Sequence, residues 1–253
     1  MKCRFLLMVL VLFFTSVSEA QMKSTNYMQG IKENDLSKCW CTDKSAANNS
    51  DLQTMLPEPI GFIGEQYQRF FIHYITITKS VTNPYQYNVT GKTKVKENIC
   101  DFSGIITIVK AGIYTKQLDN RYKQGFVECE VDFKEDGKQV ATGFIKGKLT
   151  TKFYLDEKRS AQYDDLLFGA DLYFNNQCAA SWTSYSTNKS RKVNWGDYRI
   201  PGNTGFDIGD GEFVIADKYV NNGWQNYKLA TGGDPEDEAT KTALISESLE
   251  WWK

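Results

Sequence analysis

The sequence is poor in histidine, and its 253 residues include only His73. Zinc sites built from several histidines are therefore excluded, and a Ser-His-Asp triad would have to use His73, which lies in the strand-like stretch 71–75. The sequence has no Gly-x-Ser-x-Gly elbow and no glycine-rich phosphate loop of either common type. We accordingly predict no catalytic residue, no metal site and no cofactor.

A surplus of basic residues is also absent, because the formal net charge is −1. Proteins that bind nucleic acids need cations to neutralise phosphates, so a nucleic-acid partner is disfavoured. After the first 20 residues no stretch approaches the ~18 consecutive apolar residues of a membrane helix. We predict no transmembrane segment in the mature chain.

The N-terminus has the three parts of a secretory signal peptide. A basic start at Lys2 and Arg4 precedes an uncharged apolar run over 5–14, and small residues flank Glu19 at Ser18 and Ala20. We predict that residues 1–20 are a cleaved signal peptide and that the protein is exported, either periplasmic or secreted.

Export permits disulfides. The sequence has six cysteines, of which Cys3 leaves with the predicted signal peptide. Five is an odd number, so at least one thiol stays unpaired within the chain. By its position on the apolar side of a strand, Cys129 is a packed thiol. The remaining candidates for disulfides, with connectivity left open, are Cys39, Cys41, Cys100 and Cys178.

Composition divides the mature chain into three parts. Residues 21–56 are rich in Asn, Ser, Lys and Asp and predict a flexible leader. Residues 57–230 predict a β domain. Residues 231–253 predict a tail helix, because Asp234-Pro235 and the acids after them suit a helix start.

A two-residue alternation of apolar and polar side chains dominates the β domain, for example over 87–96, 127–134 and 145–153. This pattern is typical of strands with one dry face and one wet face. With further strands at 169–174, 212–216 and 224–229, we count about nine, and such a sheet must protect its edges. We predict a mainly β fold, a single antiparallel up-and-down β-barrel, with a β-sandwich as the alternative.

The densest unusual stretch is 194–213, which combines aromatic residues, one arginine, several carboxylates and glycines. One interpretation is a structural loop in which Arg199 pairs with Asp197 or Asp207. A second is a ligand site in which a tryptophan stacks on a flat ligand such as a sugar. A third is a cation site at Asp207, Asp210 and Glu212. The predicted ligand-binding residues are Trp182, Trp195, Asp197, Arg199, Asp207, Asp210, Glu212 and Trp224.

Residues 61–70, 87–96 and 194–213 resemble stretches of uncharacterised exported bacterial proteins, a resemblance that implies no activity and no site. The expected architecture also resembles a lipocalin barrel. The lipocalin Gly-x-Trp signature belongs on the first strand, whereas here the Gly223-Trp224 pair lies near the end of the β domain, so no binding residue is carried over.

Our leading prediction is a non-catalytic exported β-barrel that binds a small ligand or a protein partner through its mouth and the loop 194–213. One alternative is a hydrolase acting on glycan or cell-envelope material through Asp207, Asp210 or Glu212. Another is a structural envelope protein without a ligand.

Overall fold

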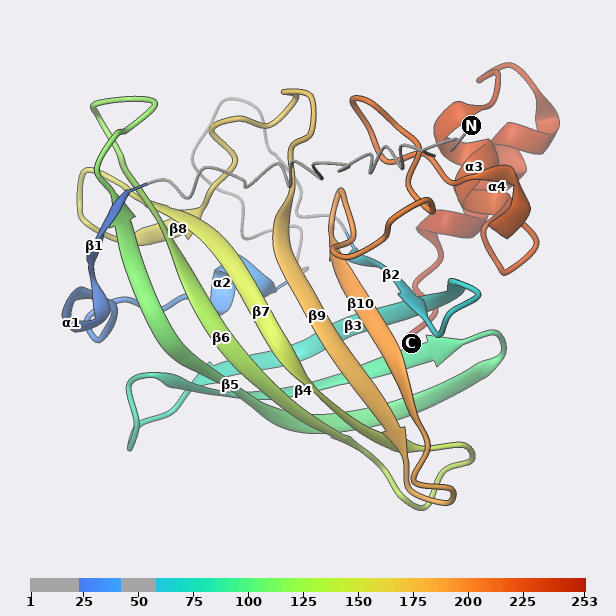
Figure 1. The fold of residues 1–253 in the computed structure, drawn as a ribbon, viewed down its shortest axis with the longest axis horizontal. Coiled ribbons are helices and arrows are strands. Elements are labelled where there is room, and N and C mark those ends of the chain that lie inside the picture. The colour runs from blue at the N-terminus through green and yellow to red at the C-terminus, as the bar shows by residue number, and fades with distance from the viewer. Residues whose placement is uncertain (1–22, 42–57) are drawn as a thin grey trace, which may run out of the picture.

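The computed structural model describes residues 23–41 and 58–253 (Figure 1). The predicted signal peptide lies outside these residues. Eight antiparallel strands form a closed barrel in which each strand pairs with the next, and the last strand pairs with the first. The prediction of an up-and-down barrel is thus confirmed, and the β-sandwich alternative is not realised. The strands are β2 (Ile60–Ile63), β3 (Gln68–Lys79), β4 (Gln86–Val95), β5 (Asn98–Tyr114), β6 (Lys123–Glu135), β7 (Gly143–Leu155), β9 (Asn175–Ser184) and β10 (Ser190–Asp197).

Two short strands extend the sheet outside the closed circle: β1 (Ser24–Asn26) pairs with the end of β5, and β8 (Ala161–Tyr163) pairs with the end of β7. The helical elements are α1 (Met28–Ile31), α2 (Ser37–Trp40), η1 (Asp217–Tyr219), α3 (Gln225–Gly232) and α4 (Glu238–Ser248). None of the described helices is long and apolar enough to cross a membrane.

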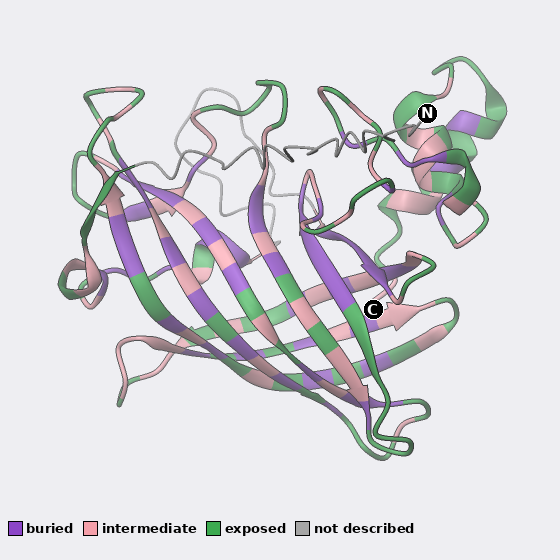
Figure 2. Cartoon of the chain, viewed as in Figure 1, coloured by how far each residue is buried: buried purple, intermediate pink, exposed green. Residues whose placement is uncertain are grey.

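The alternation read from the sequence sorts side chains between the lumen and the outer surface (Figure 2). Val127, Val131, Ile145 and Leu149 are all buried in the barrel core. Strand glycines lie where neighbouring strands approach closely: a Cβ on Gly104 would lie 2.1 Å from the carbonyl oxygen of Asp132. Any larger residue there would push the two strands apart.

Residues 23–41 differ from the flexible leader predicted for 21–56. They close one end of the barrel, where Ile31, Leu36 and Trp40 join the barrel core. Trp40 Nε1 donates a hydrogen bond of 2.7 Å to Thr151 Oγ1, and the backbone N–H of Leu36 donates to the hydroxyl of Tyr87. A few large apolar side chains anchor this segment despite its polar average composition. Residues 42–56 of that leader lie outside the described residues.

The chain after β10 forms a second apolar cluster on the outer face of β2. Ile60 and Phe62 point out of the barrel and pack with Phe206, Phe213 and Trp224. Three predicted strands are wrong in this region and just before it. Residues 169–174 form turns, 212–216 contribute one bridge between Asp207 and Ile215, and 225–229 belong to α3. In the last two segments the apolar residues Phe213, Ile215 and Trp224 pack onto this cluster without a strand partner on a ladder.

Arg69, on the outer face of β3, fixes the C-terminal helices to the barrel wall. Its guanidinium lies 4.1 Å from the ring centre of Trp224 and 4.8 Å from that of Tyr227. Glu247 of α4 accepts a hydrogen bond of 3.1 Å from Arg69 Nη2. A buried cation needs such partners, so the contacts hold α3 and α4 in one place.

Candidate functional site

The barrel lumen contains a cavity of about 350 Å³ at the end opposite α2, where the β2–β3, β4–β5, β6–β7 and β9–β10 turns meet. This is the lower right of the barrel in Figure 1. Seven of the eight barrel strands contribute side chains, so the cavity belongs to the lumen itself. It is lined by Ile63, Gln68, Phe70, Thr93, Val95, Lys96, Asn98, Cys100, Glu135, Ala141, Trp182 and Arg191.

Aromatic packing confines the space to this end. Phe102 and Phe133, on the neighbouring strands β5 and β6, stack with ring centres 5.0 Å apart, and Tyr74 meets both rings edge-on. Farther along the lumen, Trp40 and Tyr87 fill the end that residues 23–41 close. These aromatic rings therefore fill the lumen beyond the cavity.

Glu135 is the carboxylate inside the cavity, and it is only 6% exposed. Its oxygens accept hydrogen bonds from Thr93 Oγ1 at 2.6 Å, the backbone N–H of Gly143 at 2.8 Å and Trp182 Nε1 at 2.9 Å. Three donors compensate a buried carboxylate for the water it has lost. Glu135 thus joins β4, β6, β7 and β9 and orients the Trp182 ring at the cavity wall.

Two cations stand at the cavity mouth. Arg191 lies opposite Trp182 in the β9–β10 register, and Lys96 lies in the turn after β4. Both are exposed, and within the described part of the chain neither makes an ion pair or a side-chain hydrogen bond. The mouth therefore presents two cations to solvent above an apolar cavity.

The thiol of Cys100 is a packing group in the cavity wall. Burial, together with the nearby Glu135 carboxylate, raises the pKa of Cys100 to about 11. It stays protonated near neutral pH and is a poor nucleophile.

The disulfide prediction is wrong for Cys39, Cys100 and Cys178, which are buried thiols, and no two cysteines of the described residues are bridged. Cys39 and Cys178 point into the barrel core, where they pack as small apolar side chains. Cys41 is partly exposed at the end of the first described segment.

The predicted ligand-binding residues do not form one site. Trp195 is buried in the barrel core and donates to the Tyr74 hydroxyl at 3.1 Å, and Trp224 is buried in the outer cluster. Neither ring has a face available for stacking on a ligand. Trp182 lines the lumen cavity.

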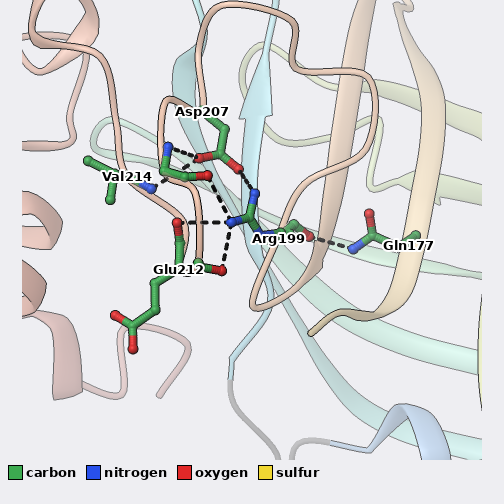
Figure 3. A network of polar contacts seen from close by, with 7 residues as sticks. Gln177, Arg199, Asp207, Glu212 and Val214 are labelled. Atoms are coloured by element: carbon green, nitrogen blue, oxygen red, sulfur yellow. Dashed lines mark hydrogen bonds and ion pairs between the residues drawn. The ribbon is translucent and has the colours of Figure 1, made fainter. Parts of the chain in front are cut away.

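Arg199 and Asp207 form the structural tie that was the first interpretation of the loop 194–213 (Figure 3). Arg199 Nη1 lies 2.6 Å from Asp207 Oδ2, while Nη2 donates to the carbonyl oxygens of Gly209, Gly211 and Glu212. The second oxygen of Asp207 accepts from two backbone N–H groups of the same loop. Both groups of this pair are therefore engaged in holding the loop.

Asp210 and Glu212 are exposed on that loop, and in Figure 3 the Glu212 carboxylate points away from Arg199. Glu212 and Arg199 line a different cavity, outside the barrel. Among the described residues no three His, Cys, Asp or Glu side chains are grouped as a metal site requires. The loop therefore offers no support for the cation-site interpretation.

Asp197 lies at the end of β10, buried between Asn176 and Tyr163. Its Oδ2 accepts hydrogen bonds from Asn176 Nδ2 at 2.6 Å and from the Tyr163 hydroxyl at 2.9 Å. Burial outweighs these bonds and raises the pKa of Asp197 to about 7. The alternative in which Arg199 pairs with Asp197 is not realised, because Arg199 bonds to Asp207 instead.

Sequence reasoning missed Thr93, Lys96, Glu135 and Arg191. The alternation of inward and outward side chains along each strand already indicated two of these residues. Glu135 is two residues from Phe133, and Arg191 is two residues from Val193, so each shares a face with a residue of the barrel core. A charged residue at an inward position near a strand end predicts a polar group at the mouth of the barrel.

No protein-family model matches this chain, and no curated protein or solved structure is significantly similar to it.

Proposed function

We propose that this protein is an exported, non-catalytic carrier that holds a small amphipathic acid in its lumen. The apolar body of the ligand would fill the cavity, and its anionic group would lie between Lys96 and Arg191. The observation that carries this proposal is the combination of an apolar cavity in the lumen with two unpaired cations at its mouth.

The cavity suits this ligand in size and chemistry. Its volume of about 350 Å³ falls within the range of about 300–1,000 Å³ found for small-molecule sites. Phe70, Ile63 and Trp182 offer apolar surface, and each Å² of ligand surface they cover contributes about 25 cal/mol. Closed eight-stranded barrels are wide enough to hold one small ligand.

The placement of charge sets the orientation of the ligand. The buried Glu135 carboxylate in the cavity wall would repel an anionic group from the cavity interior. Lys96 and Arg191 at the mouth attract one, and there the group keeps part of its hydration. An acid thus enters with its apolar end first.

The residues of the cavity wall favour a carrier over an enzyme. Glu135 is saturated with hydrogen bonds, and the thiol of Cys100 is protonated near neutral pH. The hydrolase alternative depends on loop carboxylates, of which Asp207 is engaged by Arg199. Export rests on the signal peptide predicted for residues 1–20.

Calorimetric titration of the purified protein with decanoate and with decanol tests the proposal. We expect decanoate to bind with a negative heat-capacity change, the mark of buried apolar surface, and decanol to bind roughly tenfold more weakly, a difference of about 1.4 kcal/mol. Arg191→Met and Lys96→Met should each weaken decanoate binding while leaving decanol binding unchanged.

Lys158→Met is the matched control, because Lys158 is an exposed lysine in the turn between β7 and β8. It should leave both affinities unchanged. Equal affinities for the acid and the alcohol would refute the role of the rim cations. An absence of binding by either ligand to the folded protein would refute the carrier proposal.

A further inference from the structure

A second cavity, of about 300 Å³, lies outside the barrel at the end where β9 begins and β10 ends. Three segments enclose it: the loop between β8 and β9, the loop after β10, and α3. The first two are joined by a hydrogen bond of 3.0 Å from the backbone N–H of Leu172 to the carbonyl oxygen of Gly211. The cavity lining includes Phe168, Asp171, Tyr173, Tyr198, Arg199 and Glu212.

Three aromatic rings meet at this cavity. The ring centres of Phe168, Tyr173 and Tyr198 lie 5.1–6.1 Å apart, and each ring is inclined by 59–85° to the other two. Rings set at such angles present faces in several directions. A flat ligand can stack on one face only, whereas a compact cation can contact the negative faces of several rings at once.

The unpaired charges of the cavity lining are all negative. Arg199 is neutralised by Asp207 at 2.6 Å. Asp171 and Glu212 are exposed, and within the described residues neither side chain has an ion pair or hydrogen bond. The cavity therefore carries two unpaired carboxylates beside the rings, which favours a cation over a neutral sugar.

We propose that this second cavity is a binding site for a quaternary or alkylated ammonium group, with Phe168, Tyr173 and Tyr198 as the aromatic cage and Asp171 and Glu212 as its acidic rim. An ammonium ion without N–H donors needs ring faces and negative charge, and both are present here. The proposal is independent of the lumen ligand, because the two cavities share no lining residue.

Choline and neohexyl alcohol form a matched pair of probes, since the alcohol has the same shape and no charge. Calorimetry and saturation-transfer NMR on the N-methyl protons should detect choline binding to the full chain, and the alcohol should bind at least tenfold more weakly.

Phe168→Leu separates cation–π attraction from packing, because leucine keeps apolar bulk and removes the ring. Phe168 is 53% exposed, so the variant should fold as the wild type does, which circular dichroism verifies. We expect it to weaken choline binding roughly five- to thirtyfold. Glu212→Gln should weaken it several-fold, and Glu130→Gln, on the exposed outer face of β6, should have no effect.

Arg191→Met should leave choline binding unchanged, because Arg191 lines only the lumen cavity. Equal binding of neohexyl alcohol and choline, or wild-type choline affinity in Phe168→Leu, would overturn the ammonium site. Binding of methyl glucoside in place of choline would overturn it in favour of a carbohydrate site.

Discussion

The two ends of this barrel share the same β-sheet wall, but the lumen is filled at one end and holds a cavity at the other. At one end Trp40, Cys39 and Leu36 fill the lumen, and the nearby external cavity carries unpaired carboxylates. At the other end the lumen keeps a cavity, and its mouth carries unpaired cations. The β wall is continuous between them. The two ends differ in which segments of the chain cover them. Residues 23–41 close one end, and turns between strands surround the other.

A buried carboxylate has a different role at each end of the barrel. Glu135 at the open end is held by three donors, and it shapes a cavity wall. Asp197 at the closed end has two side-chain donors and a pKa raised by burial to about 7. The first group is compensated for its burial, while the second charges at a cost to folding whenever the solution is neutral or basic.

The largest expected effect is on the free energy of unfolding, when the tryptophan at each end of the barrel is replaced. Trp40→Ala should reduce the free energy of unfolding by about 3–5 kcal/mol, because the ring is buried and the hydrogen bond to Thr151 is lost. Trp182→Ala, at a partly exposed position, should cost roughly 1–2 kcal/mol and abolish decanoate binding. Urea unfolding followed by far-ultraviolet circular dichroism measures both. Equal losses would contradict the distinction between a filled and an open end.

A smaller effect concerns the pH dependence of stability at the closed end. The folded state raises the pKa of Asp197 to about 7, so between roughly pH 4 and pH 7 the folded state binds a proton that the unfolded state has lost. The free energy of unfolding contributed by this group is therefore fully present below about pH 4 and is lost as the pH rises from about 4 to about 7.

Asp197→Asn should remove this dependence, because asparagine keeps an oxygen that accepts from Tyr163 and Asn176 and never ionises. We expect the variant to be more stable than wild type at pH 8 by a few kcal/mol and to show no such gain at pH 4. Urea unfolding at both pH values measures the difference. A constant difference between the two proteins across this range would contradict the raised pKa.

The open end was closer to what the sequence predicts than the closed end. The alternation at Val127, Cys129 and Val131 continues to Glu135, so the inward direction of that carboxylate follows from parity alone. Its partner Thr93 lies 42 residues away, and only the closure of the barrel brings the two together. Composition could not predict the N-terminal closure, since four buried apolar residues between 31 and 40 decide it within a polar segment. The sequence of residues 194–213 also does not indicate that Trp195 points into the lumen, while Arg199 pairs with Asp207 outside the barrel.

A charge reversal at the mouth would make the open end resemble the external cavity. Lys96→Glu places a carboxylate where a cation stood, and Arg191 alone remains to attract an acid. Decanoate affinity should fall roughly tenfold or more, a change of about 1.4 kcal/mol, and decylammonium should bind more tightly than it does to the wild type. Calorimetric titration with the two ligands measures this exchange. Unchanged affinities for both ligands would show that the rim charges do not select the ligand.

The smallest expected effect is common to both cavities. Lys96, Arg191, Asp171 and Glu212 are all exposed, and salt screens exposed charges over a Debye length of about 10 Å at 0.1 M and about 3 Å at 1 M. Raising sodium chloride from about 0.1 M to about 1 M should therefore weaken decanoate at the mouth and choline at the external cavity by a few-fold each, while decanol affinity does not fall. A choline affinity that resists salt while decanoate weakens would show that the ring faces bind the ammonium ion with little help from Asp171 and Glu212, and that the two ends differ in mechanism as well as in sign.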